Sequence, residues 1–160
     1  MLHITPNQPS GVSLLLYFTH PLKKTPLQCW AFGAHKIWLG AVLEAGEKHG
    51  RKVSYYACDV RQEQTVKDAF TKFVPLLQHP IRGLLACAGI SLNGPSTEFP
   101  VESIRRQFDI NATGTFVVAQ LVANEVKKTG LSASMVFVAS MSGYVANKVS
   151  SPVDKGGLWR

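Results

Sequence analysis

Two apolar runs joined by a long amphipathic passage constrain this chain more than any other feature. The first run, residues 82–90, ends at the small residues Ala88 and Gly89, and the second, residues 135–143, carries Ser140 after its apolar part. Apolar runs separated by a helical passage predict a β-α-β unit and a parallel sheet. Ligands of open parallel sheets bind at the carboxyl ends of the strands. We therefore expect the site at Ala88, Gly89 and Ser140.

Composition favours one globular domain without a nucleic-acid or membrane function. The chain has 160 residues, 46% of them hydrophobic, which suffices for a substantial core. Its net charge of +7 is spread along the chain, and no basic run is interleaved with aromatic residues, so a solvated surface is favoured over nucleic-acid binding. No apolar run approaches the roughly 18 residues of a membrane span. We expect neither nucleic acid nor a membrane as a partner.

The cysteines and histidines do not suggest a metal site. Cys29, Cys58 and Cys87 lack the spacing of metal ligands, and the five histidines are scattered. Cys58 and Cys87 lie in apolar runs, which indicates buried free thiols. Free thiols are typical of a reducing compartment, so we expect a cytoplasmic protein.

Local patterns predict the remaining elements. Residues 11–18 form a short apolar run that favours a buried strand; a secretory leader is the alternative, but no basic segment precedes it. Two prolines and the lack of a period predict a loop over 21–34. Helical spacing and aromatic or β-branched runs predict, in order, a helix over 37–50, a strand over 51–58, a helix over 66–77, a helix starting near Pro100, and a helix with Phe116, Ala119, Val122, Ala123 and Val126 on one face.

Four segments together resemble the short-chain dehydrogenase/reductase family, in a form similar to fungal polyol dehydrogenases and sorbose-reductase-like members. They are Cys58-Asp59-Val60, Leu85-Ala86-Cys87-Ala88-Gly89-Ile90, the stretch 108–116, and Ser140-Met141-Ser142-Gly143. The resemblance implies an α/β fold, an incomplete Rossmann-type three-layer structure with a parallel sheet. It covers roughly residues 41–153, a partial NAD(P)-binding domain, between a non-family segment 1–40 and a non-family tail 154–160.

The resemblance implies a cofactor role for four residues. Asp59 would hold the adenine amino group of NAD(P), together with the backbone amide of Val60. Ala88 and Gly89 would let the backbone pass close to the cofactor ribose, where a larger side chain would clash. Asp59 taken alone is equally typical of a helix cap.

Two further residues would take part in catalysis by the same resemblance. Asn111 would kink its helix and hold a water of the proton relay, and Ser140 would hydrogen-bond the substrate carbonyl or hydroxyl. Taken alone, Ser140 is an ordinary serine at a strand end. Asn111-Ala112-Thr113 also spells a glycosylation sequon, which we interpret as accidental within a helix.

Two family features have no counterpart in the sequence. No Gly-rich turn precedes Asp59, because the glycines upstream are dispersed, so we expect little affinity for a dinucleotide pyrophosphate. Tyr144 and Lys148 spell the catalytic Tyr-x-x-x-Lys pattern, but Tyr144 follows Ser140 by only four residues, where the family leaves about a dozen. We interpret this pair as a coincidence of sequence.

The resemblance implies an NAD(P)-dependent oxidoreductase that acts on a small alcohol or ketone. A homo-oligomer is a possible assembly. The chain itself reads as a truncated and inactive form. The alternative is a non-catalytic fragment or mis-spliced product that at most pairs with full-length relatives.

The sheet also needs a strand that the family pattern does not supply. In the family order, two strands lie between the strand at 52–58 and the strand at 82–88. Residues 12–18 are the only apolar run upstream, so we predict that they provide a surrogate strand.

Overall fold

The structure is a computed structural model, and it describes residues 15–18, 28–32, 44, 47–48, 52–56, 58–77, 79–140 and 143–144. Its strands are β1 (Leu15–Phe18), β2 (Gln28–Phe32), β3 (Lys52–Tyr56), β4 (Gly83–Ala86) and β5 (Ser134–Phe137). Its helices are α2 (Glu63–Phe73), the 3₁₀ turn η1 (Val74–Leu76), α3 (Val101–Phe108), the π-helical turn η2 (Asp109–Gly114) and α4 (Thr115–Thr129).

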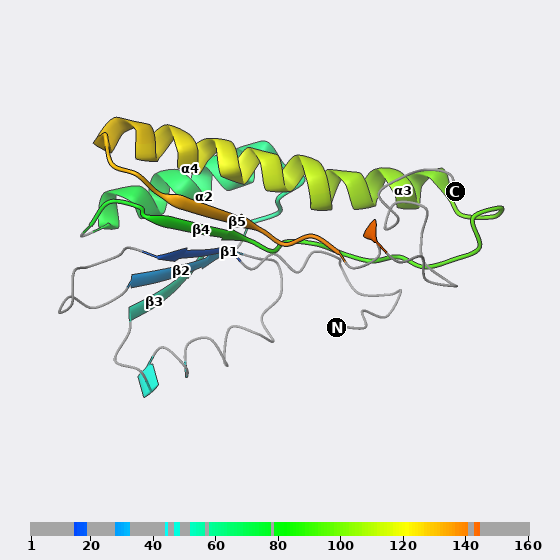
Figure 1. Ribbon diagram of the computed structural model, residues 1–160, viewed down its shortest axis with the longest axis horizontal. Helices are drawn as coiled ribbons and strands as arrows, with labels where there is room; N and C mark the ends of the chain where they lie inside the picture. The colour runs from blue at the N-terminus through cyan, green and yellow to red at the C-terminus, as the bar shows by residue number, and fades with distance from the viewer. Residues whose placement is uncertain are drawn as a thin grey trace.

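The five strands form one sheet in the order β3-β2-β1-β4-β5. β2 pairs with β3 in parallel, β4 pairs with β5 in parallel, and β1 is antiparallel to both β2 and β4. Every strand except β1 therefore runs in the same direction. Helices α2, α3 and α4 lie on one face of the sheet, and the helical piece at 47–48 is drawn below it (Figure 1). The predicted Rossmann-type α/β fold is confirmed, with one antiparallel strand inserted.

The prediction for the missing neighbours of β3 and β4 is partly right. Residues 15–18 do form a strand beside β4, from Leu15 opposite Ala86 to Phe18 opposite Gly83; residues 12–14 lie outside the described residues. The predicted loop over 21–34 is wrong at residues 28–32, since all five residues of β2 pair with β3. A five-residue strand of this kind depends on its partner strand, which no local pattern reveals.

The core lies between the sheet and the helix layer. Phe73 is fully buried and packs edge-on against Phe70, with ring centroids 4.8 Å apart. Along β4 the buried Leu84 and Ala86 alternate with half-buried residues, as expected for a strand with one covered face. The buried apolar residues are Cys58, Val60, Val66, Ala69, Phe70, Phe73, Ile81, Leu84, Ala86, Ile90, Ile110, Val118 and Val122.

Helix α4 faces the core with part of the predicted apolar face, since Ala119 and Val126 pack against the core. Val122 is buried as expected, but Val118 shares the core with it, while Phe116 is 64% exposed and Ala123 is also exposed. The π-helical turn η2 lies directly before α4, and its i→i+5 bonding accommodates one more residue per turn than i→i+4. The predicted end of the helix is confirmed, since Gly130 caps α4 in the left-handed conformation with φ 66°.

The last residue of η2 packs against the loop after β3. Gly114 is buried, and a side-chain carbon added there would lie 2.8 Å from Val60 Cβ, 2.8 Å from Val60 Cγ2 and 3.0 Å from the Val60 carbonyl oxygen. Real contacts of this type do not approach so closely, so the helix can reach the loop only with glycine at this position.

Replacing Gly114 by alanine should therefore destabilise the fold. The added methyl group forces η2 away from Val60, and overpacking of this kind costs about 1–3 kcal/mol of unfolding free energy. Urea unfolding followed by circular dichroism measures it. The matched control is Gly143→Ala, because Gly143 is exposed and an added carbon there has no neighbour within 4 Å. Equal midpoints for the two variants would contradict the proposed close approach.

Candidate functional site

The strand ends singled out by the sequence lie at one edge of the sheet. β3, β4 and β5 run in the same direction, so the residues after them leave the sheet on the same side. Asp59 and Val60 follow β3, Ala88 and Gly89 follow β4, and Ser140 follows β5. This is the edge at which open parallel sheets bind ligands.

The turn η2 joins two of these strand ends. Gly114, at its carboxyl end, packs against Val60 after β3. Asn111, in its middle, hydrogen-bonds Ile90 after β4. β3 and β4 are separated by two strands, so η2 provides a direct contact to both strand ends that the sheet itself lacks.

Asn111 holds both main-chain groups of Ile90. The Ile90 amide donates to Asn111 Oδ1 at 2.8 Å, and Asn111 Nδ2 donates to the Ile90 carbonyl at 2.9 Å. A primary amide has two donor hydrogens and two acceptor lone pairs, so one of each remains available. The predicted helix distortion coincides with the π-helical turn, a feature frequent at functional sites. The predicted water of a proton relay stays a prediction.

Gln107 assists Asn111, and sequence reasoning missed it. Its side chain is fully buried, and its Oε1 accepts a hydrogen bond from the Leu92 amide at 3.2 Å. Residues four apart lie on the same face of a helix, so Gln107 and Asn111 together hold residues 90–92. The available signal was a second amide side chain one turn before Asn111.

Close packing requires glycine at position 114 but not at position 89. A side-chain carbon at Gly89 would meet only Asn111, with Oδ1 at 3.5 Å, which is an ordinary contact. Packing within the described chain therefore does not demand glycine at this position. A backbone that a ligand approaches closely would demand it, and this is compatible with the cofactor contact that the family resemblance implies for Ala88 and Gly89.

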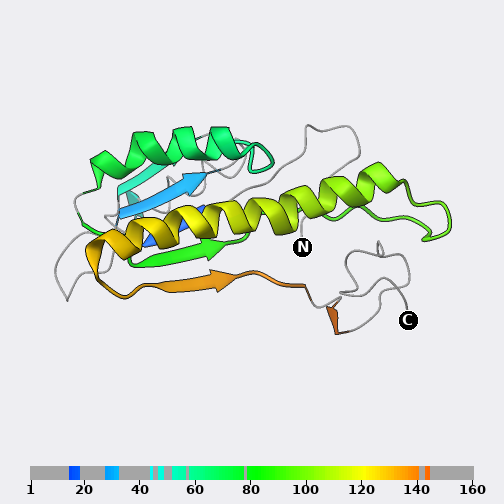
Figure 2. The same ribbon diagram turned by 90° about the horizontal axis from the view of Figure 1, so that it is seen from above.

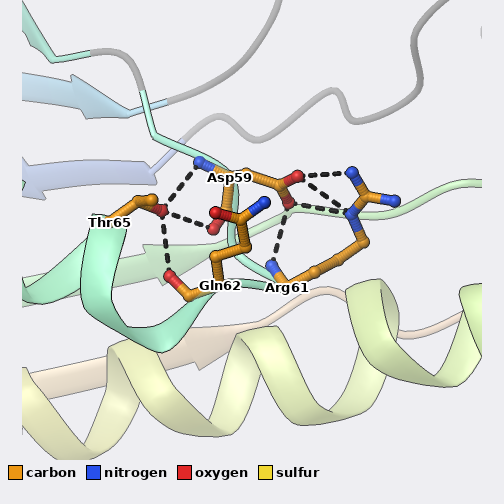
Figure 3. A network of polar contacts seen from close by, with 4 residues as sticks. All are labelled: Asp59, Arg61, Gln62 and Thr65. Atoms are coloured by element: carbon orange, nitrogen blue, oxygen red, sulfur yellow. Dashed lines mark hydrogen bonds and ion pairs between the residues drawn. The ribbon is translucent and has the colours of Figure 1, made fainter.

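Asp59 forms a polar network with the start of α2 (Figure 3). Its Oδ1 accepts hydrogen bonds from the Arg61 amide at 3.0 Å and from Arg61 Nε at 2.9 Å, while Oδ2 accepts from Nε at 3.0 Å and forms an ion pair with Nη2. The Asp59 carbonyl accepts from the Thr65 hydroxyl at 2.8 Å. The helix-cap alternative for Asp59 is wrong, because the N-cap of α2 is Gln62.

The Arg61 guanidinium stabilises the ionised form of Asp59. Its hydrogen bonds lower the pKa of the Asp59 carboxyl below the ordinary value, and the charge of Arg106 lowers it further. Asp59 is ionised at neutral pH, as a carboxyl of ordinary pKa would also be, and its negative charge favours contact with a donor such as an amino group. However, Arg61 makes two contacts with each carboxylate oxygen, and a carboxylate has about four acceptor positions. An adenine amino group has to displace at least one of these contacts.

Cys58, next to Asp59, is not a nucleophile. Burial raises the pKa of its thiol to about 11, with a smaller contribution from the Asp59 charge, so it stays protonated at neutral pH. Neither of the two cysteines with a described side-chain environment forms a disulfide bond; Cys58 is buried and Cys87 is half-buried. The buried thiol expected at Cys58 is confirmed, whereas Cys87 is only half-buried. Within the described ranges, no group of three or more histidine, cysteine or acidic residues could hold a metal ion.

Ser140 lies in an exposed turn after β5. Its carbonyl accepts a hydrogen bond from the Gly143 amide at 3.2 Å, and Tyr144, next in the chain, is 93% exposed. A tyrosine that shuttles a proton in a dehydrogenase site needs a fixed position facing the reacting atoms. The exposure of Tyr144 supports the interpretation that Tyr144-x-x-x-Lys148 is coincidental; Lys148 lies outside the described residues.

No helix in the described part of the chain combines the length and the apolar character that crossing a bilayer requires.

Comparisons with known proteins agree with this geometry. A family model described as short chain dehydrogenase matches residues 22–152. The short chain dehydrogenases/reductase notP' of Aspergillus versicolor is 52% identical over 107 residues, which are 67% of this chain and 37% of that protein. Sorbose reductase sou1 of Schizosaccharomyces pombe is 32% identical over 117 residues, which are 72% of this chain and 46% of that protein.

Solved structures agree on the fold. The structure of an NAD+-bound xylitol dehydrogenase superimposes with a TM-score of 0.72 at 22% identity, covering 81% of this chain and 49% of that one. The chain thus spans half or less of the length of these relatives. The family match starts upstream of residue 41, and the proposed division at residues 40 and 153 stays a prediction.

Replacing Asn111 by alanine should release the segment after β4. Both main-chain groups of Ile90 lose their partner, and leaving a buried polar group unsatisfied costs about 1–3 kcal/mol. Hydrogen exchange followed by NMR should show the Ile90 amide exchanging roughly tenfold faster or more. Asn124→Ala is the control, because Asn124 is exposed on α4. Unchanged hydrogen-exchange protection of the Ile90 amide in Asn111→Ala would show that Asn111 does not fix the segment after β4.

Replacing Arg61 by glutamine should raise the pKa of the Asp59 carboxyl toward its ordinary value of about 3.9. Because the folded-state pKa is depressed, the stabilisation is present above the unfolded pKa and is lost as pH falls through the folded pKa. The wild type should thus be more stable than the variant at pH 6, by less than about 1 kcal/mol for this partly exposed pair, and equally stable at strongly acidic pH.

The measurements for Arg61→Gln are an NMR titration of the Asp59 carboxyl carbon and urea unfolding at both pH values. Lys67→Gln is the control, since Lys67 pairs with Glu63 on the same helix. An Asp59 pKa that responds equally to both substitutions would show that Arg61 has no special role.

Proposed function

Because this chain belongs to the short-chain dehydrogenase family, we propose that its described part forms the adenosine end of an NAD(P) site and one wall of the adjoining substrate site. The reaction class is the interconversion of an alcohol and a carbonyl compound. The observation that carries the proposal is the position of η2, which contacts the residues after β3 and the residues after β4 at once. Asp59, Val60, Ala88 and Gly89 would contact the cofactor.

The proposed substrate is a small polyol or the corresponding ketose. One relative is a sorbose reductase, and a protein of similar fold is a xylitol dehydrogenase. The exposed Ser140 would donate a hydrogen bond to the substrate carbonyl oxygen, which stabilises the charge that develops there during reduction. Asn111 would orient the residues after β4 beside it and, with its remaining donor and acceptor, hold a water.

The residues present fit one end of the cofactor better than the other. When bound, NAD(P) supplies or accepts the hydride. The ionised carboxylate of Asp59 and the missing side chain at Gly89 suit the adenosine end. For the pyrophosphate, the sequence before Asp59 offers only dispersed glycines, and two or three lost charge-assisted bonds of about 1.5–3 kcal/mol each reduce affinity by several decades. We therefore propose that this chain alone binds a dinucleotide no more tightly than millimolar.

The alternative function is that of a non-catalytic partner of full-length relatives. Its support is that, among the described residues, no buried tyrosine faces Ser140. A reducing, cytoplasmic location would suit either function, because the buried thiol of Cys58 is free.

An NMR titration with ADP, NADH and NADPH tests the proposed site. We expect the amides of Val60 and Ile90 to shift with ADP only at millimolar concentration, and NADH and NADPH to bind no more tightly than ADP. Asp59→Asn should weaken this binding, because it removes the acceptor charge for the amino group. Asp68→Asn, an exposed change on α2, should not.

Two outcomes of the titration would contradict the proposal. The absence of any shift at Val60 and Ile90 up to saturating ADP would remove the adenosine site and favour the non-catalytic alternative. Micromolar binding of NADH would instead show that the chain contains a pyrophosphate site which its glycine spacing does not reveal.

A further inference from the structure

Arg106, on α3, has a buried cationic nitrogen that lacks a hydrogen-bond partner. Its side chain is half-buried, and no group among the described residues accepts a hydrogen bond from its Nε. The adjacent Arg105 differs, because it is exposed and forms an ion pair with Glu102. Leaving the N–H of a buried charged group without an acceptor is unfavourable, and native structures rarely retain one without a reason. Arg106 is therefore poised to gain an acceptor from a neighbouring group.

Helix α3 places Arg106 beside the loop that follows β3. Seen from above, α3 extends past the carboxyl ends of β4 and β5, at the edge where the candidate site lies (Figure 2). Arg106 lies one turn before the fully buried Ile110 and two turns before Gly114, which packs against Val60. Residues about four apart share a helix face, so Arg106 lies on the side of the helix that contacts this loop. Asp59 precedes Val60 in the same loop.

Two guanidinium groups from different elements act on the Asp59 carboxylate. Arg61 hydrogen-bonds both of its oxygens and lowers the Asp59 pKa, whereas Arg106 lowers this pKa further through its charge alone. Hydrogen bonding to Asp59 raises the pKa of the Arg61 guanidinium, and the charge of Asp109, at the start of η2, raises it further. The Cys58 thiol stays protonated and adds no charge. Asp59 therefore has a second cation nearby, and Arg61 has a second carboxylate.

We propose that Arg106 is a positioning residue of the nucleotide site, which pairs with Asp59 when the amino group of an adenine nucleotide displaces Arg61. The nucleotide step rests on the adenosine site proposed above. The exchange of one arginine for the other rests only on the described side chains. Arg61 would then pair with Asp109, so that both arginines keep a carboxylate partner.

The exchange explains how Asp59 can accept an amino group although Arg61 occupies it. Arg61 contacts both carboxylate oxygens, partly through its own main-chain amide, and thereby uses the acceptor positions. A guanidinium that approaches from α3 needs only one oxygen, and the other then accepts from the amino group. The carboxylate keeps a charged partner throughout, and the buried Nε of Arg106 gains an acceptor. The displacement of Arg61 is thus compensated within the chain.

The Asp59 pKa in four chains tests the exchange: the wild type, Arg61→Gln, Arg106→Gln and the double variant. We expect Arg61→Gln to raise the pKa only part of the way to its ordinary value, because Arg106 replaces the lost partner, and the double variant to reach that value. When Arg61 is also replaced, Arg106→Gln should change the acid dissociation constant of Asp59 by about twofold or more beyond its effect in the wild type. An NMR titration of the Asp59 carboxyl carbon measures all four.

The Nε–H signal of Arg106 reports the new contact directly. In Arg61→Gln at pH 6 this signal should move downfield, because the N–H gains a carboxylate acceptor. In the wild type, ADP should move it in the same direction and in parallel with the Val60 amide. Inorganic pyrophosphate carries charged phosphates but no amino group, so it should leave the signal unchanged. This readout needs no substitution of Arg106 and stands if Arg106→Gln fails to fold.

Two further substitutions separate a positioning role from a merely structural one. Arg106→Lys in the Arg61→Gln background should keep the Asp59 pKa below its ordinary value, because the ammonium group retains the charge and the donors. Arg105→Gln removes the neighbouring arginine of the same helix, whose partner is Glu102. It should alter neither the Asp59 pKa nor the Arg106 signal in either background.

Four results would overturn the inference. Equal effects of Arg106→Gln with and without Arg61 would show that Arg106 is a fixed charge and not an exchanging partner. An Arg106 signal that follows pyrophosphate as it follows ADP would make Arg106 an anion contact. If ADP shifts the Val60 amide but not the Arg106 signal, the adenosine site stands and the positioning role fails. If ADP shifts neither, the adenosine site fails and the positioning role fails with it.

Discussion

The two hydrogen bonds between the Asn111 side chain and the main chain of Ile90 are the contact on which the arrangement of the candidate site depends. Strand pairing alone does not bring the ends of β3 and β4 together, because two strands lie between them. The turn that carries Asn111 also carries Gly114, whose missing side chain lets it reach Val60. Six residues of π-helix therefore fix two strand ends relative to one helix.

The sequence predicts the parts of the fold whose signal is local. Strand β4 and helix α2 follow from their own periodicity, and Gly130 follows from the rules for helix ends. Strand β2 was missed because its pairing with β3 is a relation between distant segments. The antiparallel direction of β1 could not be foreseen for the same reason. An apolar run shows that a strand needs partners, but it does not show which partners or in which direction.

The candidate site shows the same contrast between local signals and contacts between distant segments. The family resemblance pointed to Asp59, Gly89, Asn111 and Ser140; three of them follow strands β3, β4 and β5, and Asn111 contacts the segment after β4 from η2. Gln107 escaped notice, because a glutamine in a helix is ordinarily a surface residue and only the Leu92 amide gives it a buried role. The neighbours that a side chain meets in space are what a single sequence conveys least.

Asp59 shows why resemblance to a cofactor site does not by itself imply affinity. The contact with Arg61 stabilises the ionised carboxylate and at the same time occupies its acceptor positions. Exchanging part of an exposed ion pair, which contributes about 0–1 kcal/mol, for one hydrogen bond to an amino group, which contributes about 0.5–1.5 kcal/mol, changes the free energy little. The adenosine end can thus determine where a nucleotide lies, but not how tightly it is held. Affinity has to come from the charged phosphates, and the amides that would receive them belong to a Gly-rich turn that the sequence before Asp59 does not contain.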